Sequence, residues 1–338
     1  MRHGIQVIRD GPSAAPPLLL IHGSGAGSAT WGPVVPALAA RRHVIRVDLP
    51  GCGRSPVAPS YDVPGQAARV AGVLDDLGLR SVTVAGHSSG GYVATSLAEQ
   101  RPDLVGPMAL ISTGPDLSAF RPQPLILRVL LGPAFGPLLW RIRTDTLIRR
   151  AILATCAQPA PAHAVSTPAP ARSITTADAT PPASTPAVAP PAPARSISTA
   201  DATPPVSTPA VAPPASAPAS VSPASTADAA PPVVIPPIVI PPVVIPDDMV
   251  AELRGITYRT MSAVLRANTA YLAERGVPDR LAALGRTALV IFGAADPRWE
   301  PSSAHRYTTS RVELLPGVGH LPMIEDPAST AELLLGAD

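Results

Sequence analysis

The sequence predicts an α/β protein in which a mostly parallel β-sheet is covered by helices on both faces. The first observation behind this fold class is that short apolar runs alternate with segments of helical spacing. The second is that the excess of proline and the shortage of aromatic residues are concentrated in one segment. Residues 157–246 hold 24 of the 46 prolines and no Phe, Trp or Tyr. Outside that segment about 250 residues of ordinary composition remain, which is enough for one large domain.

Six runs of aliphatic and β-branched residues are predicted to form the strands of the sheet. They are residues 18–21, 44–48, 81–85, 108–111, 288–292 and 312–315. Helical spacing follows the first three runs, over residues 31–41, over residues 70–77 and from Val93 to near Pro102. In parallel sheets the chemistry gathers in the loops beyond the carboxyl ends of the strands. We therefore expect a functional site in these loops.

The long segment between the fourth and fifth strands has helical patterns at both ends, over residues 116–156 and 247–284. These patterns predict a helical cap over the sheet. We therefore expect residues 1–114 and 276–338 to form the two parts of the core, and residues 115–275 to form the cap.

A Pro/Ala-rich low-complexity insertion, residues 157–246, interrupts the predicted cap. It contains a tandem repeat, because residues 171–193 recur as residues 194–216 with three changes. The repeats lack an apolar face that could stack into a solenoid, and proline favours extended chain. We interpret the insertion as disordered and tolerated. Two alternatives stay open, namely a proline-rich tether that binds a partner and a gate over the active site.

Charge and composition exclude several classes of function. With 26 basic and 24 acidic residues the net charge is +2. The chain therefore lacks the strong positive electrostatic field that favours binding to nucleic acid or to an anionic membrane. Every basic residue is arginine, which excludes catalysis by a lysine. Cys52 and Cys156 make neither a disulfide framework nor a metal site. Because the start lacks the apolar run of a signal peptide and residues 124–140 are broken by Arg128 and prolines, we expect a cytoplasmic protein without a membrane span.

The strongest local motif is Gly-His-Ser-Ser-Gly-Gly at residues 86–91, directly after the third predicted strand. A strand, a sharp turn and a helix would present Ser88 at a strained elbow, where flanking glycines avoid steric clash. Ser88 would then lie at the N-terminus of that helix, where backbone N–H groups are unpaired. We therefore predict that Ser88 is a catalytic nucleophile.

A serine hydroxyl needs a base and a group that orients the base. Asp296 follows the fifth predicted strand, and His320 follows the sixth behind two glycines. The chain order Ser88, Asp296, His320 is one of the known orders of a catalytic triad. Asp116, just after the fourth strand, is a competing candidate for the acid. Glu325 and Asp326 are expected to begin the final helix, where acidic side chains suit the positive end of the helix dipole.

Acyl transfer also needs two donors that stabilise the oxyanion of the tetrahedral intermediate. The backbone N–H of Ser89 is one candidate, and that of Ser24, in the His-Gly-Ser-Gly loop after the first strand, is the other. His22 is expected to order this loop, and His87 to pack in the elbow. Cys52 lacks a local base, so we interpret it as a small loop residue rather than a nucleophile.

These motifs together resemble the α/β-hydrolase superfamily, specifically its esterase-like serine hydrolases with a helical cap. The matching pieces lie outside the insertion, in family order, at residues 22–25, 48–55, 86–91, 293–296 and 319–327. The resemblance implies the α/β-hydrolase fold and the triad Ser88, Asp296 and His320. Epoxide hydrolases and haloalkane dehalogenases share this fold but carry Asp at the elbow, where this chain has Ser88.

The predicted function is hydrolysis of a small or medium carboxylic ester, with a lactone or thioester as possible substrates, and without a cofactor or metal. Apolar cap residues between 125 and 139 could line an acyl pocket. One alternative is a C–C bond hydrolase of the meta-cleavage-product or β-diketone type. Those enzymes tend to carry Asn before the serine and Trp after the histidine, where this chain has His87 and Leu321. Another alternative is a ligand-binding protein that retains the triad without turnover.

Overall fold

The computed structural model describes residues 1–122, 128–129, 131–157 and 243–337. Nearly all of the predicted insertion, including its tandem repeat, lies outside the described residues. Its disorder, its partner and its role as a gate therefore stay predictions. None of the helices within the four described stretches is long and apolar enough to cross a membrane.

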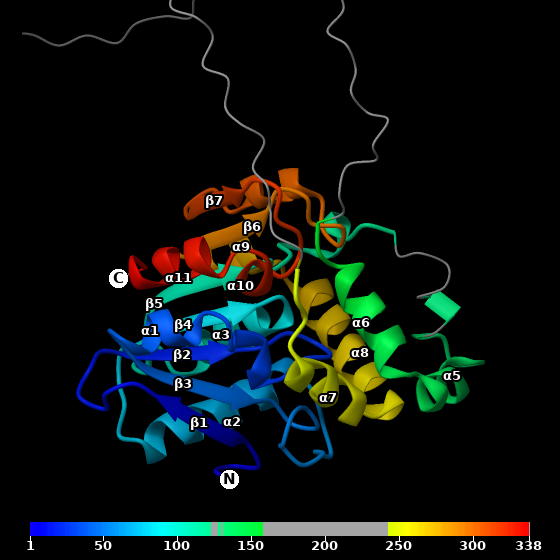
Figure 1. Ribbon diagram of the computed structural model, residues 1–338. Helices are drawn as coiled ribbons and strands as arrows, with labels where there is room; N and C mark the ends of the chain where they lie inside the picture. Colours follow the sequence, from blue (N-terminus) through cyan, green and yellow to red (C-terminus); the bar gives the residue numbers. More distant parts are fainter. Residues whose placement is uncertain (123–127, 130, 158–242, 338) are drawn as a thin grey trace, which may run out of the picture. The chain divides into compact units, whose positions relative to one another are not determined.

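The described residues form a seven-stranded sheet in the order β1-β3-β2-β4-β5-β6-β7 (Figure 1). Only the pairing of β1 with β3 is antiparallel among these strands, so the sheet is mostly parallel as predicted. The strands are β1 (Gln6–Asp10), β2 (Pro17–Ile21), β3 (His43–Asp48), β4 (Val82–His87), β5 (Val105–Ile111), β6 (Leu289–Gly293) and β7 (Arg311–Leu315).

Six of the seven strands coincide with the predicted runs, and β1 is the one that the sequence pattern missed. Its sequence, Gln-Val-Ile-Arg-Asp, has only two apolar residues in a row, and none of its five residues is fully buried. A short edge strand with charged side chains protects the sheet from pairing with another chain. It therefore lacks the apolar run by which the central strands are recognised.

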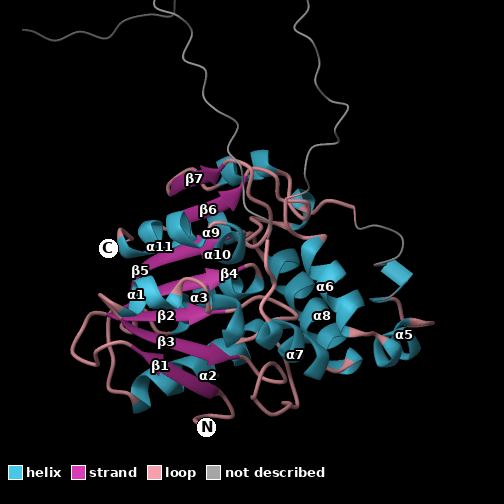
Figure 2. Cartoon of the chain, in the orientation of Figure 1, coloured by secondary structure: helices cyan, strands magenta, loops and turns pink. Residues whose placement is uncertain are grey.

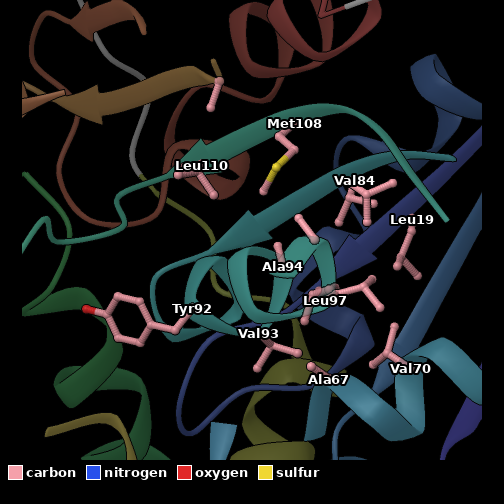
Figure 3. Packing of buried hydrophobic residues seen from close by; sticks show 14 of the residues in the cluster. Leu19, Ala67, Val70, Val84, Tyr92, Val93, Ala94, Leu97, Met108 and Leu110 are labelled. Atoms are coloured by element: carbon pink, nitrogen blue, oxygen red, sulfur yellow. The ribbon is translucent and has the colours of Figure 1, made fainter. Parts of the chain in front are cut away.

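Two hydrophobic clusters bury the two faces of the sheet, as β2 shows. Leu19 and Ile21 belong to one cluster, and Leu18 and Leu20 belong to the other, because successive strand residues point to opposite faces. The first face is covered by α2 (Val63–Asp76), α3 (Ser89–Gln100) and α9 (Val277–Ala283), and the second by α1 (Val35–Ala39) and α11 (Pro327–Leu335). Figure 3 shows the packing of α3 against the first face, where Val93, Ala94 and Leu97 lie beneath the strands.

The predicted helix over residues 31–41 is wrong in its bounds. The structure has a 3₁₀ turn, Ser28–Trp31, and then the short helix α1, Val35–Ala39. Pro33 and Pro36 explain the break. Proline cannot donate a backbone hydrogen bond, so Pro33 interrupts the helical pattern and Pro36 is accommodated in the first turn of α1.

Four helices of the region predicted as a cap lie at the end of the sheet toward which the central strands run (Figures 1 and 2). They are α5 (Gly136–Ile142), α6 (Asp145–Leu153), α7 (Asp247–Gly255) and α8 (Tyr258–Glu274). The indole N–H of Trp140 in α5 donates to the carbonyl of Ile256, 2.7 Å away, between α7 and α8. Segments on both sides of the insertion thus pack into one helical layer.

Candidate active site

Ser88 lies at the turn between β4 and α3, with a φ of 51° and a ψ of −121°. This conformation costs a residue other than glycine roughly 1–3 kcal/mol, and such strain is concentrated at functional sites. The turn is also tightly packed, because a Cβ on Gly90 would lie 2.3 Å from the carbonyl oxygen of Ile21. The glycines after Ser88 therefore allow α3 to begin directly against β2.

The structure brings Ser88, Asp296 and His320 together from the ends of three strands, β4, β6 and β7. His320 Nδ1 lies 2.8 Å from Asp296 Oδ2, and His320 Nε2 lies 3.2 Å from Ser88 Oγ. Asp296 is fully buried and His320 is 2% exposed. This is the arrangement in which a carboxylate orients an imidazole toward a hydroxyl.

The Asp296 carboxyl is held in its ionised form by its neighbours. Burial alone opposes ionisation, but the adjacent His320 and the backbone N–H of Arg298 outweigh it and lower the pKa of Asp296 below its ordinary value. The Arg298 N–H donates to Asp296 Oδ1 at 2.8 Å, which leaves Oδ2 for His320.

The two residues predicted to supply the oxyanion donors lie side by side. Ser24 Oγ and Ser89 Oγ are 2.8 Å apart and share a hydrogen bond. The loop that carries Ser24 passes directly over the nucleophile, since a Cβ on Gly23 would lie 2.9 Å from the Cβ of Ser88. The loop of Ser24 thus lies against the residue that carries the proposed nucleophile.

A residue that the sequence did not single out joins this pair. Asn268, in the cap helix α8, donates from Nδ2 to Ser24 Oγ at 2.9 Å. Asn268 stands 244 positions from Ser24 and belongs to no motif. Nothing in a single sequence signals such a contact, because it depends on how the cap packs on the core.

The space beside the serine pair is small in this structure. A cavity lined by Ser24, Ser89, Asn268, Val93 and Val264, among others, has room for about one water molecule. The expectation that apolar residues between 125 and 139 line an acyl pocket fails at Phe135 and Leu138, which are 63% and 64% exposed. Of the other expected residues, Leu131 and Leu139 are half-buried, and Leu131 packs against the cluster of Cys52, Trp140, Ile256 and Met261. Leu125, Ile126 and Leu130 lie outside the described part of the chain.

Two further histidines are neutral and order the loops, as expected. His22 Nε2 accepts from the Leu49 N–H at 2.9 Å, so its Nδ1 carries the proton and donates to the Gly23 carbonyl. Its pKa is lowered by burial. His87 Nε2 donates to the backbone carbonyl of His320 at 2.9 Å. Burial and the nearby His320 lower the pKa of His87 to about 3.

The competing acids do not contact the His320 ring. Asp116 accepts from the Ser118 N–H and pairs with Arg306 at 2.5 Å. Asp326 caps the N-terminus of α11, as expected, by accepting from the Ser329 N–H at 3.1 Å. Glu325 corrects the prediction, because it ends the short helix α10 (Pro322–Glu325) rather than beginning the final one. Its carboxylate points back toward the His320 loop.

Cys52 is not placed to act as a nucleophile. It is 4% exposed, and burial together with the carboxylates of Asp48 and Glu252 raises the pKa of its thiol to about 12. A thiol with so high a pKa stays protonated and unreactive at neutral pH. Within the described stretches no three His, Cys, Asp or Glu side chains gather into a group that could hold a metal ion.

Comparisons with known proteins agree with this architecture. Residues 16–140 match the family described as the alpha/beta hydrolase fold. The chain is 39% identical over 102 residues to the pimeloyl-acyl-carrier protein methyl ester esterase of Aeromonas hydrophila. These aligned residues make up 30% of this chain and 39% of that protein. The chain is 35% identical over 134 residues to the esterase of the same name from Neisseria meningitidis, which covers 40% of this chain and 41% of that one. The chain thus spans about two fifths of the length of these relatives.

Among solved structures, the carboxylesterase CesB of Bacillus subtilis superposes with a TM-score of 0.57 at 16% identity, covering 98% of this chain and 87% of that one. The chain has the α/β-hydrolase fold.

Proposed function

We propose that the protein hydrolyses a small or medium carboxylic ester, or a lactone or thioester by the same acyl transfer, and that Ser88, His320 and Asp296 carry the reaction. One observation carries this proposal, the alignment of the His320 ring between Asp296 Oδ2 at 2.8 Å and Ser88 Oγ at 3.2 Å. The two curated relatives described above are named as esterases, which supports it.

In the proposed acylation, His320 Nε2 takes the proton of Ser88 as Ser88 Oγ attacks the carbonyl carbon of the ester. Asp296 accepts the Nδ1–H bond and stabilises the imidazolium that forms. The backbone N–H groups of Ser24 and Ser89 stabilise the oxyanion of the tetrahedral intermediate. The C–O bond then breaks, and the alcohol leaves with the proton that His320 returns to it.

Deacylation repeats these steps with water. His320 takes a proton from the water as its oxygen attacks the acyl-enzyme, and the second tetrahedral intermediate collapses to the free acid and Ser88. Every proton moves through one imidazole, so this scheme requires neither a cofactor nor a metal.

Replacing Ser88 with Ala tests the proposal. We expect turnover of p-nitrophenyl acetate and butyrate to fall at least about 10³-fold, because the covalent route is removed. A fluorophosphonate should add once to the wild-type protein, at Ser88, and not to the variant, as read by intact-mass and peptide mass spectrometry. Ser96→Ala, at a second buried serine of α3, is the matched control. Equal turnover in the Ser88 and Ser96 variants contradicts the assignment.

The alternatives are separated by their products. A C–C bond hydrolase would release an acid and a ketone, whereas an ester hydrolase releases an acid and an alcohol. A ligand-binding protein would bind small molecules saturably without turnover. A panel of esters, lactones and thioesters of increasing acyl length, with Ser88→Ala as the blank, identifies the preferred class.

A further inference from the structure

Each backbone N–H of residues 319–321, around His320, donates a hydrogen bond. The N–H of Gly319 donates to Glu325 Oε2 at 2.8 Å, and the N–H of Leu321 donates to Glu325 Oε1 at 2.9 Å. Between them, the N–H of His320 donates to the carbonyl of Thr155 at 2.8 Å. The three consecutive N–H groups are therefore all hydrogen-bonded, and two of their acceptor oxygens belong to one buried carboxylate.

Glu325 makes a third hydrogen bond, which reaches a distant part of the chain. The N–H of Ala157 donates to its Oε2 at 2.7 Å. Glu325 is 6% exposed, and no cation pairs with it among the residues that the structure describes. A buried carboxylate needs such charge-assisted hydrogen bonds, and removing one partner leaves a costly unsatisfied group.

The local fold explains how the side chain reaches this position. The single turn of α10, Pro322–Glu325, carries the carboxylate back beneath His320. The loop packs closely against the chain at Ala157, because a Cβ on Gly319 would lie 2.4 Å from the Ala157 nitrogen. Glu325 thus joins α10, the His320 loop and the end of the α6 segment.

His320 is sensitive to such support because its ring meets two partners at once. Its nitrogens lie 2.8 Å from Asp296 and 3.2 Å from Ser88, so a shift of the backbone changes both contacts. A misplacement of about 1 Å in a catalytic group can cost about 10²-fold in rate. Glu325 itself bonds to backbone amides and makes no contact with the ring nitrogens, both of which are already occupied.

We propose that Glu325 is a positioning residue for catalysis, whose carboxylate holds the backbone of residues 319–321 so that His320 reaches Ser88 and Asp296 together. This inference rests on the proposed function of the triad and adds a residue to it. Through Ala157, the same carboxylate ties the chain that enters the insertion to the histidine loop.

Glu325→Gln tests the proposal. The glutamine amide has nearly the same shape as the carboxylate, but its NH₂ group would face a backbone N–H that now donates to a carboxylate oxygen. We expect kcat to fall roughly 10- to 100-fold with KM within twofold of the wild type. Asp326→Asn is the matched control, since it removes the neighbouring carboxylate and weakens the cap of α11 without touching residues 319–321. We expect it to lower the melting temperature and to leave kcat within twofold.

A measurement that does not depend on ester turnover distinguishes the positioning role of Glu325 from the proposed esterase function. The low-field proton resonance of His320 Nδ1–H, bonded to Asp296, should be sharp in the wild type and in Asp326→Asn, and broadened or lost in Glu325→Gln. If no ester is turned over but this pattern is observed, positioning stands and the esterase proposal fails. If Glu325→Gln lowers only the melting temperature and keeps both the resonance and kcat, or if Asp326→Asn lowers kcat equally, Glu325 has no positioning role.

Discussion

The hydroxyl of Ser24 forms hydrogen bonds both to the cap and to the residue that follows the proposed nucleophile. It accepts from Asn268 Nδ2 at 2.9 Å and shares its other hydrogen bond with Ser89 Oγ at 2.8 Å. Both serines carry a proposed oxyanion donor in their backbone, so we expect the hydrogen bonds from Asn268 to Ser24 and from Ser24 to Ser89 to help position the two donors. Such donors are effective because they are already oriented before the charge develops.

Asn268→Leu should therefore reduce catalysis without abolishing it. The variant keeps the size of the side chain but removes the donor to Ser24, and one hydrogen bond contributes about 1 kcal/mol. That value corresponds to a loss of about fivefold in kcat for p-nitrophenyl acetate.

Thr269→Val provides the control for this variant, since it removes a neighbouring hydrogen bond of α8, to the Leu265 carbonyl, on the exposed side of the helix. We expect the kcat of this variant to match the wild type. A wild-type kcat in Asn268→Leu as well would show that Ser24 is oriented by its own loop.

Single residues differ in how well the sequence predicts them, and the reason is physical. Ser88, Asp296 and His320 each follow a predicted strand at a short offset, so recognising the strands also locates the three side chains. The placement of Glu325 depends on one turn of helix, α10, whose exact bounds no apolar pattern specifies. Asn268 depends on the docking of a cap helix, which leaves no local signal at all.

At the scale of elements, the central strands and the edge strand β7 were predictable, and the edge strand β1 was not. Strands β2 and β4 are buried on both faces, and most of their residues are therefore apolar. The edge strand β1 needs polar residues, so the same criterion overlooks it. The helix expected over residues 31–41 failed because the apolar spacing continues across Pro33 and Pro36, although the backbone does not.

Helix α7 carries a carboxylate whose charge state links the cap to the core. Glu252 accepts from the Ala29 N–H at 3.1 Å, and burial, reinforced by the charges of Asp48 and Asp248 and countered by Arg46, raises its pKa to about 7. An acid whose pKa is higher in the folded state stabilises the fold at low pH. This contribution is lost as the pH rises from the ordinary glutamate range through about 7.

Glu252→Gln should remove this pH dependence, because the amide stays neutral and can still accept from Ala29. We expect the variant to melt at a higher temperature than the wild type at pH 8, and at nearly the same temperature at pH 5. Glu274→Gln, at a 73% exposed carboxylate of α8, is the control. An equal difference between wild type and Glu252→Gln at both pH values would contradict the proposed titration.

For the whole molecule, the contacts at the two ends of the insertion decide where it can be removed. Ala157 donates to Glu325, Ile245 is 5% exposed within a hydrophobic cluster, and its carbonyl accepts from Arg149 at 2.7 Å. The residues just inside the expected bounds, at 157 and 243–246, are thus part of the packed protein. The compositional boundary at 157–246 differs from the structural one because composition does not register which apolar residues become buried.

A pair of deletions tests this boundary together with the prediction that the insertion is tolerated. Replacing residues 158–242 with a short Gly/Ser linker should leave kcat and the melting temperature nearly unchanged, since each halving of a loop changes its closure free energy by only about 0.6 kcal/mol. Removing residues 157–246 should destabilise the protein by about 2 kcal/mol or more, because a buried isoleucine is lost. Loss of activity in the shorter deletion would instead favour a gate or a partner-binding role.

The pairing of β5 with β6 has a consequence for synthesis of the chain. Ala109 lies opposite Leu289, and with about 180 residues between them, elongation at about 5–20 residues per second separates their appearance by roughly 10 to 35 s. During that interval β5 has no neighbour on one side, and an unpaired strand edge invites association with other chains. The insertion accounts for nearly half of this delay, so shortening it should raise the yield of soluble protein at high expression even where the activity of each folded molecule is unchanged.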